Sequence, residues 1–188
     1  LILASGSRYR ADMLRRLGVP FEVCAADIDE SPLDGEAPRA LAERLALEKA
    51  RRIAARRPEH VVIGADQVAG LDSGRILGKP GSTSAAREQL RAMSGQRVTW
   101  HSGLALVGAG RDRHTTVDTV LAMRVLSAVE IERYVERDQP LDCAGSMRSE
   151  SLGITLVESM RSDDPTALIG MPLIAVARWL RELGYPLP

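Results

Sequence analysis

One stretch of the sequence limits the possible folds more than any other: a long β-hairpin expected between residues 97 and 126. VTWHSGLALV (98–107) and TTVDTVLAMRV (115–125) are rich in β-branched and apolar residues, and a GAGRD turn precedes the second run. Strands joined by so short a connection must be antiparallel. The residues expected on one face of the second strand are Val117, Thr119, Leu121, Met123 and Val125.

Elsewhere, short apolar runs alternate with helical patterns. The other expected strands are residues 1–4, 21–26, 61–71 and 153–159, with a hairpin turn at LDSGR (71–75). The expected helices run from Ser5 or Ser7 to Gly18, over 38–57, 84–94 and 127–138, and from Pro172 to Gly184. Ser127 and Glu130 have the spacing of a capping box, which supports the fourth helix.

This alternation around an antiparallel hairpin predicts an α/β fold with a mixed central sheet flanked by helices. The chain has 188 residues, no internal repeat and no low-complexity linker, so we expect one domain over residues 1–188. A binding cleft is expected where loops meet at the strand ends.

The charge balance argues against a partner that is attracted by the net charge of the protein. Lys plus Arg and Asp plus Glu each number 25, so nothing in the net charge favours nucleic acid or an anionic membrane. No apolar run approaches the roughly 20 residues that span a bilayer, and LILAS is too short for a signal peptide. Cys24 and Cys143 form no CxxC motif and are typical of reduced thiols. We therefore expect a cytoplasmic protein without nucleic-acid or membrane partners.

Two polar loops carry residues that a hydrophobic core does not need. In SGSRYR (5–10), hydroxyls, helix-start N–H groups and the guanidinium of Arg8 or Arg10 can hold an anion such as phosphate. A simple helix N-cap with solvated arginines is the alternative interpretation. CAGSMRSESLG (143–153) contains Arg148 and Glu150, but its pattern is equally typical of an ordinary surface loop.

A third segment, GADQVAG (64–70), has a carboxylate between apolar neighbours. Burying Asp66 without a partner would cost several kcal/mol, so it needs a cation. Lys79 in LGKP or a divalent metal can supply that charge, and a purely structural ion pair is the alternative. Glu30 in DIDE and Lys49 in ALEKA are further candidates, although each alone is more often a surface residue.

The sequence motifs of several common hydrolase classes are missing. His60, His101 and His114 lack the paired spacing of a metal site, and no serine lies in a GxSxG motif. The phosphate-binding GxxxxGK[ST] loop is also absent. A phosphate site in this chain must therefore be built differently.

Six motifs, in order and over nearly the whole chain, resemble those of the Maf proteins: SGSRYR, DIDE, ALEKA, GADQV, LGKP and CAGSMRSESLG. Maf proteins are nucleoside triphosphate pyrophosphatases related in fold to inosine triphosphate pyrophosphatases. The resemblance implies that fold, with a cleft between two lobes, and a hydrolase of acid anhydrides. It also implies a divalent cation (Mg, Mn or Co), a nucleoside triphosphate substrate and a homodimer.

The resemblance also assigns roles by position. Asp66 is then the proton acceptor that activates water, or a ligand of the cation, and Glu30 is a carboxylate on the metal side. The residues that match the triphosphate-holding motif and its basic partners are Ser5, Ser7, Arg10, Lys49 and Lys79.

FEVCAADIDE, CAGS, GITLVE and GMPLIA most resemble the branch that hydrolyses 7-methyl-GTP to 7-methyl-GMP and diphosphate, a house-cleaning activity. The resemblance marks Tyr9, Gln67 and Glu150 as specificity residues. That branch usually has tryptophan at the first position, and tyrosine attracts a cationic 7-methylguanine ring less strongly. Glu150 can accept hydrogen bonds from the N1–H and amino groups of guanine, a donor pair that pyrimidines lack.

Two alternatives stay open at this point. Another branch of the same family prefers dTTP and UTP, and the carboxylate of Glu150 argues against that specificity. The second alternative is a nucleotide-sensing regulator of cell division, which would have no obvious need for Asp66 beside two lysines.

Overall fold

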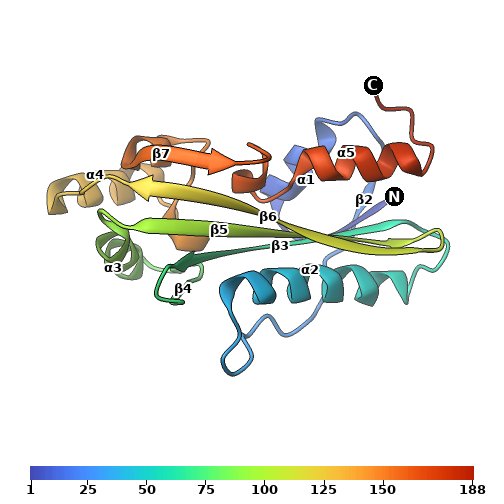
Figure 1. Ribbon diagram of the computed structural model, residues 1–188, viewed down its shortest axis with the longest axis horizontal. Coiled ribbons are helices and arrows are strands. Elements are labelled where there is room, and N and C mark those ends of the chain that lie inside the picture. Colours follow the sequence, from blue (N-terminus) through green and yellow to red (C-terminus); the bar gives the residue numbers. More distant parts are fainter.

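The computed structural model describes residues 1–188 and contains one seven-stranded sheet with helices on both faces (Figure 1). The strands are β1 (Ile2–Ala4), β2 (Glu22–Val23), β3 (Val62–Leu71), β4 (Ile76–Leu77), β5 (Arg97–Gly108), β6 (Arg111–Met123) and β7 (Val157–Ser162). The α-helices are α1 (Arg8–Arg15), α2 (Pro38–Ala54), α3 (Thr83–Met93), α4 (Ala128–Asp138) and α5 (Leu173–Glu182).

The sheet order is β2-β1-β3-β5-β6-β7, and β4 also pairs with β3. β1 is parallel to both β2 and β3, whereas every other pair is antiparallel. The predicted α/β class with a mixed sheet is therefore confirmed.

The predicted hairpin forms the long axis of the molecule. β5 and β6 pair from Arg97 and Ala122 to Gly108 and Arg111. Both strands extend from one end of the molecule toward the other (Figure 1). Of the residues expected to share one face of β6, Thr119, Leu121 and Met123 are buried and Val117 is half-buried. Val125 was wrongly included, because it lies beyond the end of β6 and is 82% exposed.

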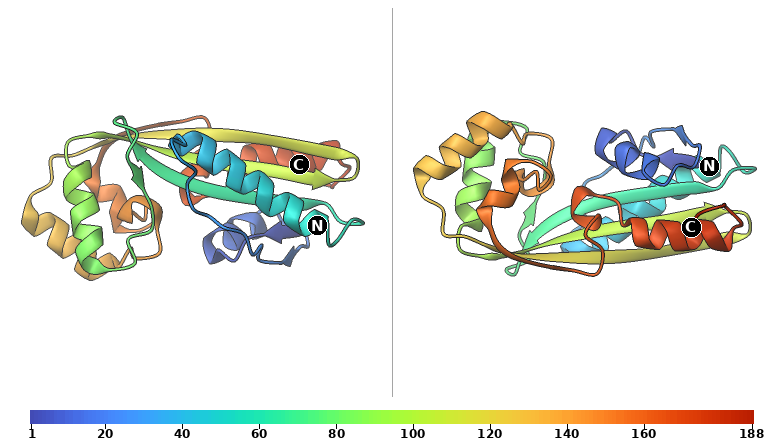
Figure 2. Two further views of the ribbon diagram at one scale, coloured as in Figure 1. Left: turned by 90° about the horizontal axis from the view of Figure 1, so that it is seen from below. Right: turned by 90° about the horizontal axis from the view of Figure 1, so that it is seen from above.

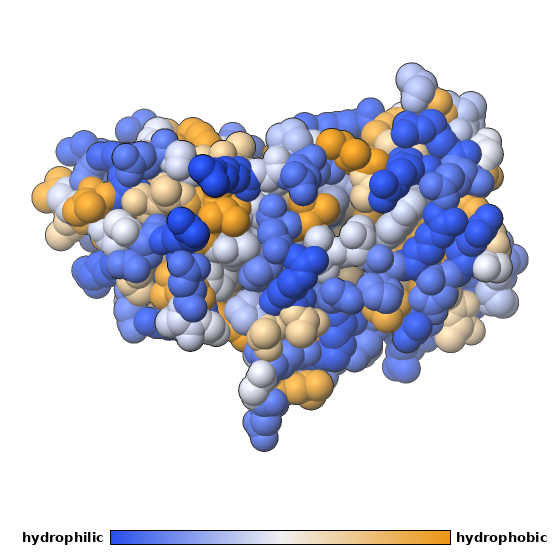
Figure 3. Space-filling view, in the orientation of Figure 1, coloured by the Kyte–Doolittle hydropathy of each residue, from blue (hydrophilic) through white to orange (hydrophobic).

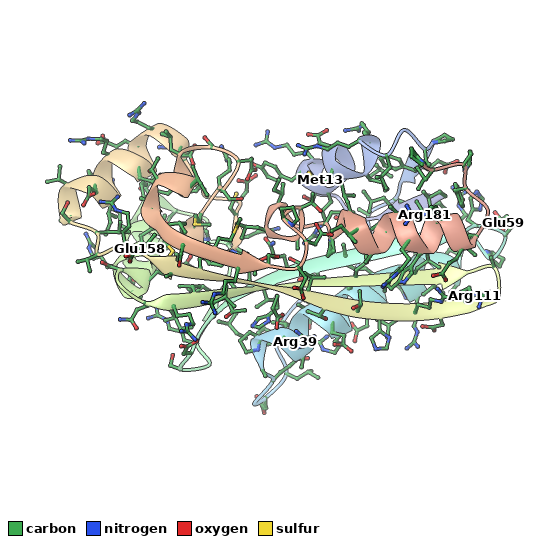
Figure 4. All side chains as sticks on the ribbon, turned by 45° about the horizontal axis from the view of Figure 1, so that its top comes forward. Met13, Arg39, Glu59, Arg111, Glu158 and Arg181 are labelled. Carbon is green, nitrogen blue, oxygen red and sulfur yellow. The ribbon has the colours of Figure 1, made fainter.

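Helix α2 lies unusually close to the sheet because two glycines face it. A Cβ atom at Gly64 on β3 would lie 2.1 Å from the carbonyl oxygen of Ala46, and one at Gly103 on β5 would lie 2.2 Å from that of Ala42. Helices α1 and α5 cover the opposite face, so that Met13 and Arg39 lie on opposite sides of the sheet in Figure 4. This close approach brings the α2 residue Lys49 against β3.

The other end of the molecule is a second lobe. There α3 and α4 pack with Trp100, Leu121 and Met123 around a separate cluster of buried side chains. Figure 2 shows α3, α4 and the connecting 140–156 segment grouped at one end of the sheet, with α1, α2 and α5 toward the other. No helix combines the length and the apolar character needed to cross a bilayer. Hydrophilic side chains cover most of the face seen in Figure 3.

Two predicted strands are shorter in the structure. Residues 152–156 form a 3₁₀ helix, and β7 starts only at Val157. The reason is the length of β6: Val157 pairs with Met123, the last residue of β6, so earlier residues have no neighbouring strand. In the 21–26 stretch only Glu22 and Val23 pair, at the edge of the sheet. Helix α2 ends at Ala54, three residues before its predicted end.

Candidate active site

The main cleft lies where one edge of β3 is left open. That edge pairs with β1 as far as Gly64 and with β4 only from Ala69, while the other edge is paired to β5 throughout. Residues 65–68 thus face a gap between β1 and β4. A cleft of about 750 Å³ lies there, between the two lobes, and its size is typical of small-molecule sites.

Every residue that the sequence singled out for the site lies on this cleft. The ten are Ser5, Ser7, Tyr9, Arg10, Glu30, Lys49, Asp66, Gln67, Lys79 and Glu150. They come from the β1–α1 turn with the first turn of α1, the loop before α2, α2 itself, β3, the segment after β4, and the 140–156 segment. Six stretches that are distant in sequence therefore converge on one space.

Asp66 is buried and forms an ion pair with Lys49 rather than with Lys79, the lysine named by the sequence analysis. Lys49 donates to Asp66 Oδ1 at 2.6 Å, and Arg10 Nη2 lies 3.8 Å from the same oxygen. Lys79, the predicted partner, is exposed and makes no ion pair. The reason is the close packing of α2 on β3, which puts Lys49 directly beside Asp66 and offsets the cost of burying the carboxylate.

Glu30 joins the same cluster from the acidic loop. Lys49 Nζ lies 2.6 Å from Glu30 Oε1 as well as from Asp66, so one ammonium group joins two carboxylates. Partial burial of Glu30 works to raise its pKa, but the hydrogen bond and charge of Lys49, helped by Lys79 and Arg10, outweigh it and hold the pKa below its usual value. Glu30 is therefore a carboxylate near neutral pH.

The β1–α1 turn contains an N-cap, as one interpretation of SGSRYR predicted, but Arg10 is not solvated. Ser7 is the N-cap of α1, and its hydroxyl accepts from the backbone N–H of Arg10 at 3.4 Å. Ser5 Oγ accepts from the N–H of Ser7 and from Arg10 Nη1, at 3.2 and 3.3 Å. Arg10 is thereby held over the cleft, beside Asp66, rather than in solvent.

Gln67 follows Asp66 on β3 and points to the opposite face of the sheet. Its Nε2 lies 2.9 Å from the carbonyl of Ala167 and 3.0 Å from that of Leu168, with Ser102 Oγ at 3.1 Å. Since backbone carbonyls only accept, the orientation of the amide is set, and Oε1 is the group left for another partner.

Tyr9 lies within a group of charged side chains at the cleft mouth. The guanidinium carbons of Arg8 and Arg148 lie 4.9 and 5.7 Å from the centre of its ring. Burial raises the pKa of its phenol, so the hydroxyl is protonated near neutral pH and donates to Asp142 at 3.3 Å. The ring expected to hold a base is thus already in contact with two cations.

Asp142 and its neighbour Cys143 were missed by the sequence reasoning. Burial works to raise the pKa of Asp142, but hydrogen bonds and the charge of Arg148 outweigh it and hold the pKa below its usual value. Burial, aided by the charge of Asp142, raises the pKa of the Cys143 thiol to about 11, so the thiol is not reactive near neutral pH. A carboxylate directly before CAGS was the signal that could have identified Asp142.

Glu150, like Lys79, is an exposed residue of the site. It is exposed on the cleft side of the 140–156 segment, and the only hydrogen bond of its side chain is a long one of 3.4 Å from Ser149. Both oxygens of this carboxylate are therefore available to a ligand.

Comparisons with known proteins identify relatives of this chain. The family model described as "Maf-like protein" matches residues 1–183. A 7-methyl-GTP pyrophosphatase of Xanthomonas oryzae pv. oryzae (strain MAFF 311018) is 52% identical over 188 residues, covering 100% of this chain and 98% of its own. A 7-methyl-GTP pyrophosphatase of Aromatoleum aromaticum is 52% identical over 190 residues, covering 100% of this chain and 97% of its own.

Among solved structures, the Staphylococcus aureus Ham1 protein is similar with a TM-score of 0.44 and 16% identity, over 65% of this chain and 70% of that one. The family model and the full-length relatives are sufficient by themselves: the chain belongs to the Maf family.

Proposed function

We propose that this protein hydrolyses 7-methyl-GTP to 7-methyl-GMP and diphosphate. The observation that carries the proposal is the meeting of Asp66 with Lys49 and Arg10 in a cleft of nucleotide size. Full-length relatives that are 52% identical and named 7-methyl-GTP pyrophosphatase support the choice of substrate.

The triphosphate would bind along the basic wall of the cleft. Arg10 and the hydroxyls of Ser5 and Ser7 are grouped at the start of α1, where a helix N-terminus favours an anion. Lys79 is exposed and unpaired on the opposite side, so its ammonium is free to meet a phosphate. We therefore assign the phosphates to the space between α1 and the segment after β4.

The donor set fits a divalent cation shared with the substrate. Glu30 and Asp66 each use one oxygen for Lys49 Nζ, at 2.6 Å, and the second oxygen of each carboxylate would be left for the cation. No group of three or more His, Cys, Asp or Glu side chains converges in this protein. Mg²⁺ commonly uses one or two carboxylates together with substrate phosphates and water, so two carboxylates are sufficient. When bound, Mg²⁺, Mn²⁺ or Co²⁺ would offset phosphate charge and lower the pKa of the attacking water.

The proposed chemistry is a single displacement at the α-phosphorus. A water oxygen forms the new P–O bond, the bond to the bridging α–β oxygen breaks, and diphosphate leaves with that electron pair. Asp66 accepts the proton of the water. Lys49, Lys79 and Arg10 stabilise the charge that develops on the leaving diphosphate.

Base selection is assigned to the other end of the cleft. Glu150, with both oxygens available, would accept the N1–H and amino protons of guanine. The ring of Tyr9 already attracts the guanidinium groups of Arg8 and Arg148, and a cationic 7-methylguanine ring can take the place of the exposed Arg8. Gln67 Oε1 remains as a further acceptor.

The decisive experiment measures diphosphate release from 7-methyl-GTP, GTP, dTTP, UTP and CTP, with Mg²⁺ or Mn²⁺ and after chelation. Selective, metal-dependent turnover of 7-methyl-GTP supports the proposal. Preference for dTTP and UTP would assign the protein to the other branch of specificity. Tight nucleotide binding without any turnover would favour a nucleotide-sensing regulator instead.

We further propose a homodimer in the cytoplasm, with residues 1–188 acting as one unit. Cys24 and Cys143 are both free thiols, which is typical of a reducing compartment. Equilibrium sedimentation at micromolar concentration tests the dimer, and particles of only 20.4 kDa would contradict it.

A further inference from the structure

A buried carboxylate outside the cleft organises the loop between β7 and α5. Asp164 is 2% exposed and does not line the cleft. Its Oδ1 accepts from the backbone N–H of Thr166 at 2.8 Å and lies 2.5 Å from the Thr166 hydroxyl. Its Oδ2 accepts from the N–H of Ile174 at 2.8 Å, in the first turn of α5. Three donors thus converge on one buried side chain.

This carboxylate supplies the cap that α5 otherwise lacks. The N-cap position is Pro172, which has no side-chain acceptor. A negative charge beside the first N–H groups of a helix is stabilising. Thr166 extends the arrangement, because its hydroxyl also accepts from the N–H of Leu173 and lies 2.9 Å from the carbonyl of Met171. Hydrogen bonds of Asp164 and Thr166 therefore join the start of the loop to the start of α5.

The carbonyl groups of this loop hold two side chains of the cleft. Gly170 O accepts from Arg10 Nε at 3.2 Å. Ala167 O and Leu168 O accept from Gln67 Nε2 at 2.9 and 3.0 Å. Arg10 lies beside Asp66, and Gln67 follows Asp66 on β3. The loop therefore holds one side chain on each face of this strand.

We propose that Asp164 is a positioning residue for the reaction: it sets the conformation of loop 164–173, and the loop carbonyls then aim Arg10 at the triphosphate and Gln67 at the base. The inference rests on the function proposed above. A residue that only stabilised the fold would change the fraction of active protein, whereas a positioning residue changes how well each active molecule binds.

The test compares Asp164→Asn with Asp163→Asn. Asn at 164 has one oxygen for three donors and turns an N–H group toward one of them. Asp163 is exposed and its side chain makes no hydrogen bond or ion pair, so its variant is a matched control. For Asp164→Asn we expect KM for 7-methyl-GTP to rise about tenfold or more, with a smaller fall in kcat, since a lost hydrogen bond to a charged group changes binding by about that factor. Unchanged KM with reduced kcat would overturn the inference.

Thr166 offers a milder pair of variants if Asp164→Asn folds poorly. Thr166→Val keeps the shape of the side chain without the hydroxyl, and Thr166→Ser keeps the hydroxyl. We expect Thr166→Val to raise KM several-fold and Thr166→Ser to restore it. Equal KM values in Thr166→Val and wild type would count against the inference.

A third readout is independent of the substrate. In wild-type protein the Arg10 Nε–H and the Gln67 side-chain amide should exchange slowly with solvent, because both donate to the loop. NMR exchange should be at least tenfold faster in Asp164→Asn and unchanged in Asp163→Asn. Faster exchange in a protein that turns over no nucleotide would reject the proposed function but keep the positioning role. Unchanged exchange would reject the positioning role itself.

Discussion

Lys49 Nζ lies 2.6 Å from Asp66 Oδ1, although the two residues are on different elements, and both are almost completely buried, at 5% and 6% exposed. The pair exists because α2 approaches β3 at Gly64, where no side chain intervenes. Helix α2 thus places the Lys49 ammonium beside the Asp66 carboxylate, which faces the cleft. The first two predictions test the catalytic and the structural consequences of this contact.

Asp66→Asn should lower kcat for 7-methyl-GTP by about 10²–10⁴, because the amide cannot accept the proton of the attacking water. Binding should change far less, because Arg10, Lys79 and the serine hydroxyls are untouched. Steady-state kinetics and calorimetry with the same nucleotide separate the two effects. Asp72→Asn, on the exposed β3–β4 turn, is the control. Equal loss of binding and turnover would indicate that Asp66 holds the metal or the fold instead.

Lys49→Met should lower the free energy of unfolding by about 3 kcal/mol, since it leaves Asp66 buried without its nearest counter-ion. The double variant Lys49→Met/Asp66→Asn should recover part of that loss, because no uncompensated charge then remains. Urea denaturation of the four proteins gives the coupling free energy. Strictly additive effects would mean that Arg10 and solvent already compensate the carboxylate.

Tyr9→Trp should raise the ratio of kcat/KM for 7-methyl-GTP over GTP by roughly twofold to fivefold, because the larger indole face attracts a cationic ring more strongly. Tyr9→Phe is the matched control, since it removes only the hydroxyl that donates to Asp142. A ratio that is the same in all three proteins would show that the base does not stack on residue 9.

The fold could be predicted from local patterns to a large extent. The β5–β6 hairpin, the capping box of α4 and the glycine-punctuated strands are local signals, and the corresponding elements are present. The failure at residues 153–156 has a non-local cause, because the extent of β7 depends on where β6 ends. No pattern within GITLVES contains that information.

The site shows the same division between local and tertiary information. The residue types that line the cleft follow from motifs, but the partner of Asp66 does not, since it depends on how closely α2 packs against Gly64 and Gly103. The contact of Tyr9 with Arg148 likewise depends on how the second lobe meets α1. Spacing along the chain predicts which residues converge, whereas packing decides which of them pair.

Glu150→Gln should lower kcat/KM for 7-methyl-GTP and for GTP by about 10–100-fold, because an amide presents an N–H group to a guanine edge that needs two acceptors. The value for UTP should change less than threefold, since uracil lacks the donor pair, so the pyrimidine nucleotide is an internal control. Equal losses for all three nucleotides would remove Glu150 from base recognition.

The capping box of α4 makes a pH-dependent contribution to stability. Backbone and side-chain hydrogen bonds from Ser127, with a further one from Arg124, lower the pKa of Glu130 from 4.5 to about 2. Because the folded state favours the charged carboxylate, its contribution is complete above pH 4.5, the unfolded value, and is lost as the pH falls toward 2.

Wild-type protein should therefore have a higher Tm than Glu130→Gln at pH 6, and the difference should shrink steadily below about pH 4.5. Differential scanning calorimetry across this range measures the gap. Glu158→Gln is the control, because that exposed side chain of β7 (Figure 4) has no ion-pair or hydrogen-bond partner and should follow the wild-type curve at every pH. A gap between wild type and Glu130→Gln that stayed constant down to pH 2 would mean that ionisation of Glu130 contributes nothing to the capping box. Equal Tm values for the two proteins at pH 6 would mean that the side chain of Glu130 adds nothing to the start of α4.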